Sequence, residues 1–168
     1  MVTFALGLAA CGGDDDEGTT ADSTTAVQSE TDSEQPQPTN GGRSGGGGEP
    51  AGLAISASES QFGTILFDED DRAIYLFDKE TTSKSECYGQ CAAAWPPVLT
   101  KGGPQAAGGA EAKLLGTTER DDGTTQVTYA GQPLYYYVDD PPGEVLCHNV
   151  DEFGGLWLVV QPDGEPAA

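Results

Sequence analysis

Three of the four cysteines and the only histidine form the most reactive set of side chains in this 168-residue sequence: Cys87, Cys91, Cys147 and His148. Thiolates and imidazole suit zinc or copper(I), and two cysteines four positions apart fall within the spacing found at zinc sites. These residues are therefore a candidate metal or redox centre. However, neighbours in an extended loop point in opposite directions, which separates Cys147 from His148. We expect His148 to be a solvated loop residue.

The same cysteines also suit disulfide formation. On one helical turn, residues four apart have Cα atoms roughly 6 Å apart, which is within the bridging range. An exported chain meets an oxidising compartment, where disulfides persist. We expect Cys87 to pair with Cys91 and so to fix the turn that delivers Trp95, which Pro96-Pro97 follows. A bridge from Cys147 to either of the other two is the alternative.

The elements around these residues are predicted to be strands. Alternating, β-branched or aromatic runs indicate strands over residues 54–58, 63–67, 73–77, 113–118, 124–129, 133–138 and 155–160. The acidic run 68–72 is expected to be a solvated turn rather than a calcium site, because its spacing does not match a calcium loop. We expect residues 101–109, which are rich in glycine, to form a flexible loop, and residues 161–168 to fray.

Three pairs of uncommon residues recur at nearly constant spacing. Tyr75 and Tyr135 are 60 residues apart, as are Cys87 and Cys147, and Trp95 and Trp157 are 62 apart. This recurrence predicts an all-β domain of two pseudo-repeats over residues 51–165, with the repeats at about 53–100 and 113–162. Each repeat would be a hairpin plus a loop that carries a tryptophan. The two would pack as one small sheet or sandwich, with one short helical turn near Cys91.

A run of aromatic residues offers an alternative to a purely structural role. In a strand, Tyr135 and Tyr137 share one face and Tyr136 takes the other, so these side chains could form a platform for carbohydrate or peptide. Aromatic residues favour strands in any case. We therefore expect Tyr75, Phe77, Tyr135 and Tyr137 to be core and edge residues, together with the two tryptophans.

The amino-terminal segment carries the sequence Leu8-Ala9-Ala10-Cys11, which resembles a bacterial lipobox. The apolar run before Cys11 is too short to span a bilayer but fits the end of a signal peptide. We therefore expect residues 1–11 to be a lipoprotein signal remnant and Cys11 to carry a lipid. Because no Lys or Arg precedes the run, either the true start lies upstream or the segment is a fragment.

Residues 12–50 contain Val27 as their only large apolar residue and are otherwise acidic, polar or glycine-rich. Such a segment cannot bury enough apolar surface to offset its ordering entropy, so we expect a disordered tether. About forty flexible residues have a root-mean-square reach of roughly 35 Å. That reach suits a domain held away from a membrane.

The charge balance excludes several kinds of partner. The sequence has 28 Asp and Glu against 7 Lys and Arg, for a formal net charge of −21. Such a chain repels phosphate backbones and anionic headgroups, so nucleic acid is not expected as a partner. No supported catalytic triad, phosphate loop or nucleotide fingerprint is present. We expect no enzymatic activity and no cofactor, with zinc or copper as the alternative.

The tyrosine segments resemble the Tyr-x-aromatic-x-x-Asp motif of the bacterial secreted-repeat lipoproteins of unknown function. Tyr75-Leu-Phe77 and Tyr135-Tyr-Tyr137-Val-Asp-Asp140 carry this resemblance, with Glu80 where the first copy would have Asp. The stretches 87–97 and 153–160 are similar to its other landmarks. The resemblance implies an exported, repeated, β-rich module and brings no established activity.

Together these features predict a non-enzymatic structural or binding module of the cell envelope. Its lipid would hold it on the extracytoplasmic face of the bacterial plasma membrane, where an envelope protein or wall component would be its partner. The alternative is an extracytoplasmic metal-binding or electron-transfer protein that uses Cys87, Cys91, Cys147 and His148.

Overall fold

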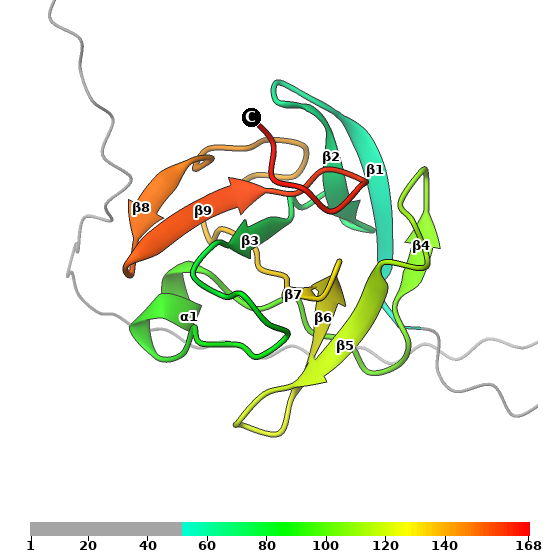
Figure 1. Ribbon diagram of the computed structural model, residues 1–168. Coiled ribbons are helices and arrows are strands. Elements are labelled where there is room, and N and C mark those ends of the chain that lie inside the picture. Colours follow the sequence, from blue (N-terminus) through cyan, green and yellow to red (C-terminus); the bar gives the residue numbers. More distant parts are fainter. Residues whose placement is uncertain (1–51) are drawn as a thin grey trace, which may run out of the picture. The chain divides into compact units, whose positions relative to one another are not determined.

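A computed structural model describes residues 52–168 of the chain (Figure 1). The predicted lipid site Cys11 and the predicted tether lie outside the described residues. The elements are β1 (Ala54–Ser60), β2 (Gly63–Asp68), β3 (Tyr75–Phe77), α1 (Gln90–Ala94), β4 (Gln105–Ala107), β5 (Leu115–Glu119), β6 (Thr125–Tyr129), β7 (Gln132–Pro133), β8 (Val150–Glu152) and β9 (Gly155–Val159). The predicted all-β class is confirmed, and the expected helical turn near Cys91 is α1. None of the described helices has the length and apolar character that crossing a membrane requires.

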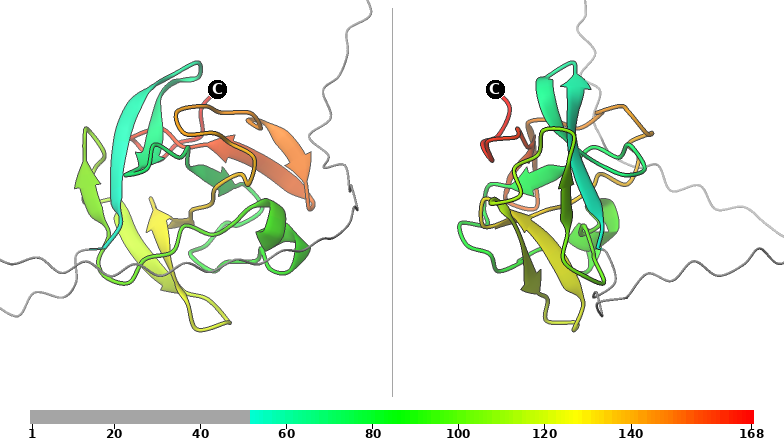
Figure 2. Two further views of the ribbon diagram at one scale, coloured as in Figure 1. Left: turned by 180° about the vertical axis from the view of Figure 1, so that it is seen from behind. Right: turned by 90° about the vertical axis from the view of Figure 1, so that its right-hand side faces the viewer.

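The strands form three small sheets rather than the single sheet or sandwich that the repeat pattern predicts. Their orders are β2-β1-β4, β3-β9-β8 and β5-β6-β7. The hairpins β1–β2 and β5–β6 lie at opposite ends of the domain in both views of Figure 2. One reason for the division is that the β6–β7 ladder opens beyond Pro133, where the Val127 amide donates to the Val98 carbonyl instead of to Leu134.

The two repeats complete each other by exchanging their tryptophan-bearing segments. In the first repeat, Val98 accepts a hydrogen bond from the Val127 amide (2.8 Å) and donates to the Leu134 carbonyl (2.9 Å). Both of these partners belong to the second repeat. Sixty-two positions later, Val160 makes the matching pair of bonds with Leu66 (2.8 Å) and Ile74 (3.2 Å) of the first repeat. Each repeat therefore supplies a segment that hydrogen-bonds to both members of the hairpin in the other repeat.

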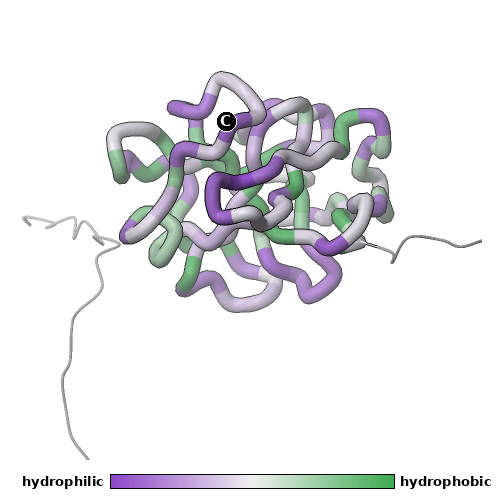
Figure 3. Tube along the Cα trace, turned by 90° about the horizontal axis from the view of Figure 1, so that it is seen from below, coloured by the Kyte–Doolittle hydropathy of each residue, from purple (hydrophilic) through white to green (hydrophobic). Residues whose placement is uncertain are grey.

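The hydrophobic core lies where these exchanged segments meet. Its buried members come from both repeats: Ile55, Leu66, Ile74, Leu76, Val98, Val127, Tyr129, Leu134, Tyr136 and Val160. Removing this apolar surface from water stabilises the domain by roughly 25 cal/mol per Å². Figure 3 shows hydrophilic stretches in the outer loops around this interior. Neither repeat could bury these side chains alone.

Two predictions about connecting segments are wrong. Within the stretch 101–109, β4 pairs in parallel with β1, and the Gln105 amide donates to the Leu53 carbonyl at 2.9 Å. The carboxyl-terminal residues also pack, because the Ala167 amide donates to the Val159 carbonyl at 2.9 Å and Ala167 is buried. Backbone pairing with an available strand edge orders both segments, although their side chains are small or polar.

Candidate functional site

Cys87 and Cys91 form the predicted disulfide, with their Cα atoms 5.3 Å apart. Gly89 precedes α1 with a positive φ of 59°, a conformation that glycine adopts without steric cost. The Trp95 amide then donates to the Cys91 carbonyl at 2.7 Å, which places the Trp95 ring in the interior. The disulfide thus fixes the turn that delivers the tryptophan, as the spacing predicts.

The alternative metal centre is not assembled in this structure. A disulfide offers no thiolate ligands, so Cys87 and Cys91 could bind a metal only after reduction. Across residues 52–168, no group of three or more His, Cys, Asp or Glu side chains is placed to hold an ion. Cys147 is fully buried, next to His148 in the sequence. A metal role for these residues stays a prediction about the reduced protein.

The two tryptophans stack directly on each other at the centre of the domain. The Trp95 and Trp157 rings are parallel within 4°, with centroids 4.2 Å apart, and both are fully buried. Phe77 stacks on the other face of Trp157 at 4.2 Å, and Tyr137 packs on Trp95 at 4.9 Å. Each tryptophan therefore contacts the motif aromatic residue of the opposite repeat. The expected core role of the aromatic residues is what this packing shows.

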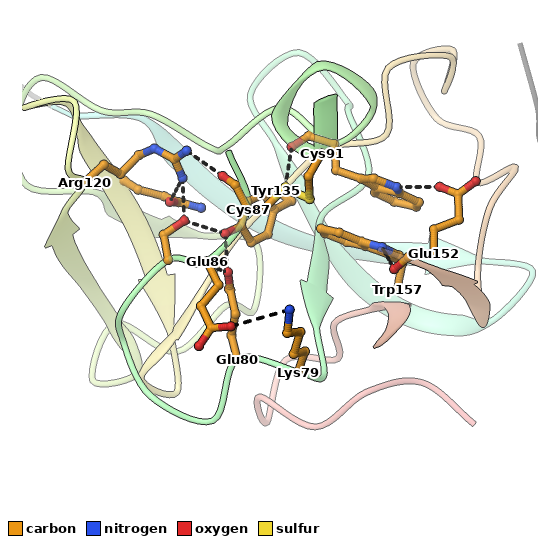
Figure 4. The surroundings of a disulfide bond; sticks show 12 residues. Lys79, Glu80, Glu86, Cys87, Cys91, Arg120, Tyr135, Glu152 and Trp157 are labelled. Atoms are coloured by element: carbon orange, nitrogen blue, oxygen red, sulfur yellow. Dashed lines mark hydrogen bonds and ion pairs between the residues drawn. A yellow bond between two sulfur atoms is a disulfide. The ribbon is translucent and has the colours of Figure 1, made fainter. Parts of the chain in front are cut away.

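Glu152 accepts a hydrogen bond from each indole. The Trp95 Nε1–H donates to its carboxylate at 2.9 Å, and the Trp157 Nε1–H donates to its main-chain oxygen at 3.2 Å (Figure 4). Buried indoles need such partners. Sequence reasoning did not single out Glu152, because nothing in its spacing relates it to the tryptophans.

The motif tyrosines are also exchanged between the repeats. Tyr75 and Tyr135 lie side by side, and the amide of each donates to the carbonyl of the other at 2.9 Å. The Tyr75 hydroxyl donates to Asp140 of the second repeat, and the Tyr135 hydroxyl donates to Glu80 of the first at 2.7 Å. Tyr75 thus bonds to the acid five positions after Tyr135, and Tyr135 bonds to the acid five positions after Tyr75. Glu80 stands where the second repeat has Asp140.

Both motif acids hold the chain just before a cysteine. Glu80 Oε1 accepts from the Glu86 amide at 2.6 Å, and Asp140 Oδ1 accepts from the Leu146 amide at 2.9 Å. Burial raises the pKa of both carboxyls above the ordinary range, although these hydrogen bonds oppose the shift. Burial likewise raises the pKa of Tyr75 and Tyr135, so both hydroxyls remain protonated and donate.

The surroundings of the two motif tyrosines are not fully symmetric, because a buried cation lies on the Tyr135 side. Arg120 is 3% exposed and donates to Ser85 Oγ and Gln126 Oε1 at 2.6 Å each, and to the Cys87 carbonyl at 2.8 Å. Ser85 Oγ lies 2.7 Å from the Tyr135 hydroxyl, which donates to Glu80. Two hydroxyls thereby connect the Arg120 cation to the Glu80 carboxylate (Figure 4).

In the other half, uncharged side chains contact the segment before and after Cys147. Gln61 donates to the Val145 carbonyl at 2.9 Å, and the neighbouring Phe62 ring lies 4.4 Å from the His148 ring. His148 Nδ1 accepts from the Val159 amide at 3.2 Å, and burial lowers its pKa. His148 lies in a turn, as expected, but it is only partly exposed, because the Phe62 ring packs against it.

These side chains define a two-repeat β domain in which each repeat packs a tryptophan-bearing segment, and makes a tyrosine–acid hydrogen bond, against the other repeat. The chain belongs to the family described as a secreted repeat of unknown function, which it matches over residues 56–99 and 116–161. The matched ranges agree closely with the predicted repeats. Neither the curated proteins nor the solved structures gave a match to the chain.

Proposed function

We propose that this protein is a non-enzymatic structural or binding module of the bacterial cell envelope, held by a lipid on Cys11 at the extracytoplasmic face of the plasma membrane. The observation that carries the proposal is that the motif side chains are buried in contacts between the two repeats. Tyr75, Tyr135, Trp95 and Trp157 are each 0% exposed and contact the opposite repeat.

This burial argues against catalysis at the motif. Acids and tyrosines with strongly shifted pKa values are ordinarily candidates for general acid–base chemistry. A general acid must also reach a substrate, whereas the Glu80 side chain is 1% exposed and already accepts from the Tyr135 hydroxyl and the Glu86 amide. A groove of about 440 Å³ lies elsewhere, lined by Leu99–Lys101 and Gly123–Thr125 rather than by motif residues. The acids and tyrosines whose pKa values are raised therefore have a structural role in the core.

The extracytoplasmic part of the proposal is supported by two observations. The family consists of secreted repeats, and the Cys87–Cys91 disulfide is a modification of oxidising compartments. The anchor itself is supported only by the run Leu8–Cys11. A lipid there would attach the domain by burial of its methylene groups in the bilayer.

The anchor is tested by membrane fractionation of a bacterium that produces the chain behind a complete lipoprotein signal. We expect the parent protein in the membrane fraction and the Cys11→Ala variant in the periplasmic or culture fluid. A Cys87→Ala/Cys91→Ala variant is the matched control, since it removes cysteines without touching the proposed lipid site. Membrane retention of Cys11→Ala equal to that of the parent would show that the anchor assignment is wrong.

The binding role is tested by sedimentation with isolated envelope material. The exported chain is mixed with washed membranes and, separately, with cell-wall fragments, and the bound fraction is measured against protein concentration. Saturable retention by one material is the expected result, because a binding module has a limited number of partner sites. Retention that stays proportional to protein concentration with both materials would contradict a binding role.

A further inference from the structure

The two hairpins differ in what lies against their outer strands. The outer side of β1 is covered by β4, which pairs with it in parallel from Ala54↔Gln105 to Ser56↔Ala107. In the second repeat, β5 takes the place of β1, since both are the first strand of their hairpin. Within residues 52–168, β5 pairs with β6 alone and lies at the end of its sheet (Figure 1).

The open side of β5 presents backbone groups to solvent. Opposite residues of an antiparallel pair exchange both of their hydrogen bonds or neither. Val127, which faces Thr117, donates its amide to Val98, and the Thr125 carbonyl, opposite Glu119, accepts from Thr100. Val127 and Thr125 thus use their backbone groups on the side away from β5. Consequently Thr117 and Glu119 direct their own amides and carbonyls outward, and both residues are exposed.

The first repeat shows what kind of chain fits such an edge. β4 has the sequence Gln-Ala-Ala, and Gly102-Gly103-Pro104 precedes it. Gly108 follows β4 with a φ of +50°, and its carbonyl accepts from the Ala57 amide at 3.2 Å. A Cβ on Gly108 would lie 3.1 Å from the Ser56 Cβ, so the position requires glycine for space as well as for conformation. An extended segment of small residues that ends in glycine is therefore the complement of this edge.

Charge narrows the choice of segment. Exposed Glu119, Asp121 and Asp122 flank the open end of β5, in a chain with a net charge of −21. An acidic segment would be repelled at this position, whereas a neutral or basic one would not. The stretch that leads into β4 itself begins with a cation, Lys101.

We propose that the outer edge of β5 is a strand-addition site for an extended, neutral or basic, Ala/Gly-rich segment of a partner protein, docked parallel to β5. Main-chain hydrogen bonds would supply the affinity, as in other cases of β-strand addition, and the small side chains would provide the selectivity. This inference rests on the proposed binding role and names the class of partner for it.

The test uses the full chain and, as a probe, an acetylated and amidated peptide with the sequence of residues 101–110. Binding is followed by backbone amide NMR shifts and hydrogen exchange. We expect saturable shifts and slowed exchange at Thr117. The Thr117→Pro variant should bind about tenfold more weakly, because it loses an outward donor. Proline is tolerated where an edge amide faces solvent, so this variant should fold.

Two matched controls isolate the backbone contribution. Thr117→Val also removes the hydroxyl but keeps the amide, so it should bind as the parent does. In the peptide, N-methylation at the position of Gln105 should abolish binding, because this amide donates in β4. N-methylation at the position of Ala106, whose amide alternates to the outer side, should leave binding unchanged.

Three results would overturn the inference: no saturable shifts, equal binding by Thr117→Pro and Thr117→Val, or shifts at Ala57 instead of Thr117. The last would mean that the peptide replaces β4 on β1. The envelope sedimentation assay separates this inference from the proposed function. If both Thr117 variants are retained on envelope material as the parent is, the strand-addition site is wrong and the binding role stands.

Discussion

Removing the two motif hydroxyls one at a time should change the free energy of unfolding by different amounts, because the two hydroxyls have different surroundings. Tyr135→Phe and Tyr75→Phe delete the same atom at positions related by the repeat. Both variants keep their rings, which pack edge-on against Trp157 and Trp95 respectively. Any difference in unfolding free energy between them therefore reflects the partners of the hydroxyl and not the packing of the ring.

The Tyr135 hydroxyl has two buried partners. It donates to Glu80 and lies 2.7 Å from Ser85, which accepts in turn from Arg120. The second carboxylate oxygen of Glu80 is already buried without a hydrogen-bond partner. Losing a hydrogen bond to a charged group that water cannot reach costs about 1.5–3 kcal/mol. We expect Tyr135→Phe to fall near the upper end of that range, at about 2.5 kcal/mol.

The Tyr75 hydroxyl donates to Asp140, which is only half-buried. Water can replace the lost donor there, and Asp140 keeps the Leu146 amide as a partner. The net cost of losing such a bond is about 1 kcal/mol. The structure therefore predicts a difference of about 1.5 kcal/mol between two chemically identical substitutions.

The measurement is urea unfolding at pH 7, followed by tryptophan fluorescence, with the slope against urea compared across variants. Tyr88→Phe serves as control, because its hydroxyl accepts from the Asp121 amide at an exposed site, and it should change stability by less than about 0.5 kcal/mol. Equal losses of unfolding free energy for the two motif variants, or a larger loss for Tyr75→Phe, would refute the reasoning that the buried hydrogen bonds of Tyr135 contribute more to stability.

Three further predictions concern the disulfide and the buried charges. The double substitution Cys87→Ser/Cys91→Ser should cost about 2 kcal/mol in urea unfolding, the chain-entropy value for so short a loop; a loss above about 4 kcal/mol would mean that the bridge does more than fix the turn. Burial raises the pKa of Glu80 above its ordinary value of 4.5, so the stability it contributes is present below that value and is lost as pH rises through the folded pKa. Measured from pH 4 upward, the free energy of unfolding of the parent protein should therefore fall relative to that of Glu80→Gln as pH rises. A relative rise for the parent protein would contradict the direction of the pKa shift. Arg120→Met should cost about 3 kcal/mol, because it leaves Gln126 Oε1 and the Cys87 carbonyl buried without their donor. Because two hydroxyls link Arg120 to Glu80, combining it with Glu80→Gln should recover part of that loss; strict additivity would show that the two groups do not interact.

The repeat and the disulfide could be predicted from the sequence because they depend on local spacing. Constant separations of tyrosine, cysteine and tryptophan indicate two copies of one unit, and the four-residue spacing of Cys87 and Cys91 fixes their Cα distance on a helical turn. Strand positions follow from aromatic and β-branched runs for the same reason. Boundaries differ by one or two residues in most strands, as at β1, which continues to Ser60. The strand predicted over residues 133–138 is wrong, because only Gln132–Pro133 forms a strand (β7) and Tyr135 makes isolated bridges.

The exchange between repeats could not be predicted in this way. A repeat spacing is the same whether Trp95 packs on its own hairpin or on the other one, so the sequence does not distinguish the two arrangements. The only sequence feature that marks Arg120 is its charge, because the acidic chain has just 7 basic residues. Its burial depends on Ser85 and Gln126, which come from different repeats and carry no pattern that relates them. β4 was missed because glycine-rich stretches do not indicate pairing.

The exchange explains why both repeats of this chain combine a tyrosine, an aromatic residue and an acid at the same spacing. The Tyr135 hydroxyl must meet the acid of the other repeat while Tyr137, two positions on, must meet that repeat's tryptophan. Alternate residues of an extended segment share a face, so both contacts are made on one side. The acid then fixes the segment before the cysteine loop that carries the next tryptophan. A substitution at any one motif position therefore weakens both repeats, which is the constraint expected of a residue that closes a joint core.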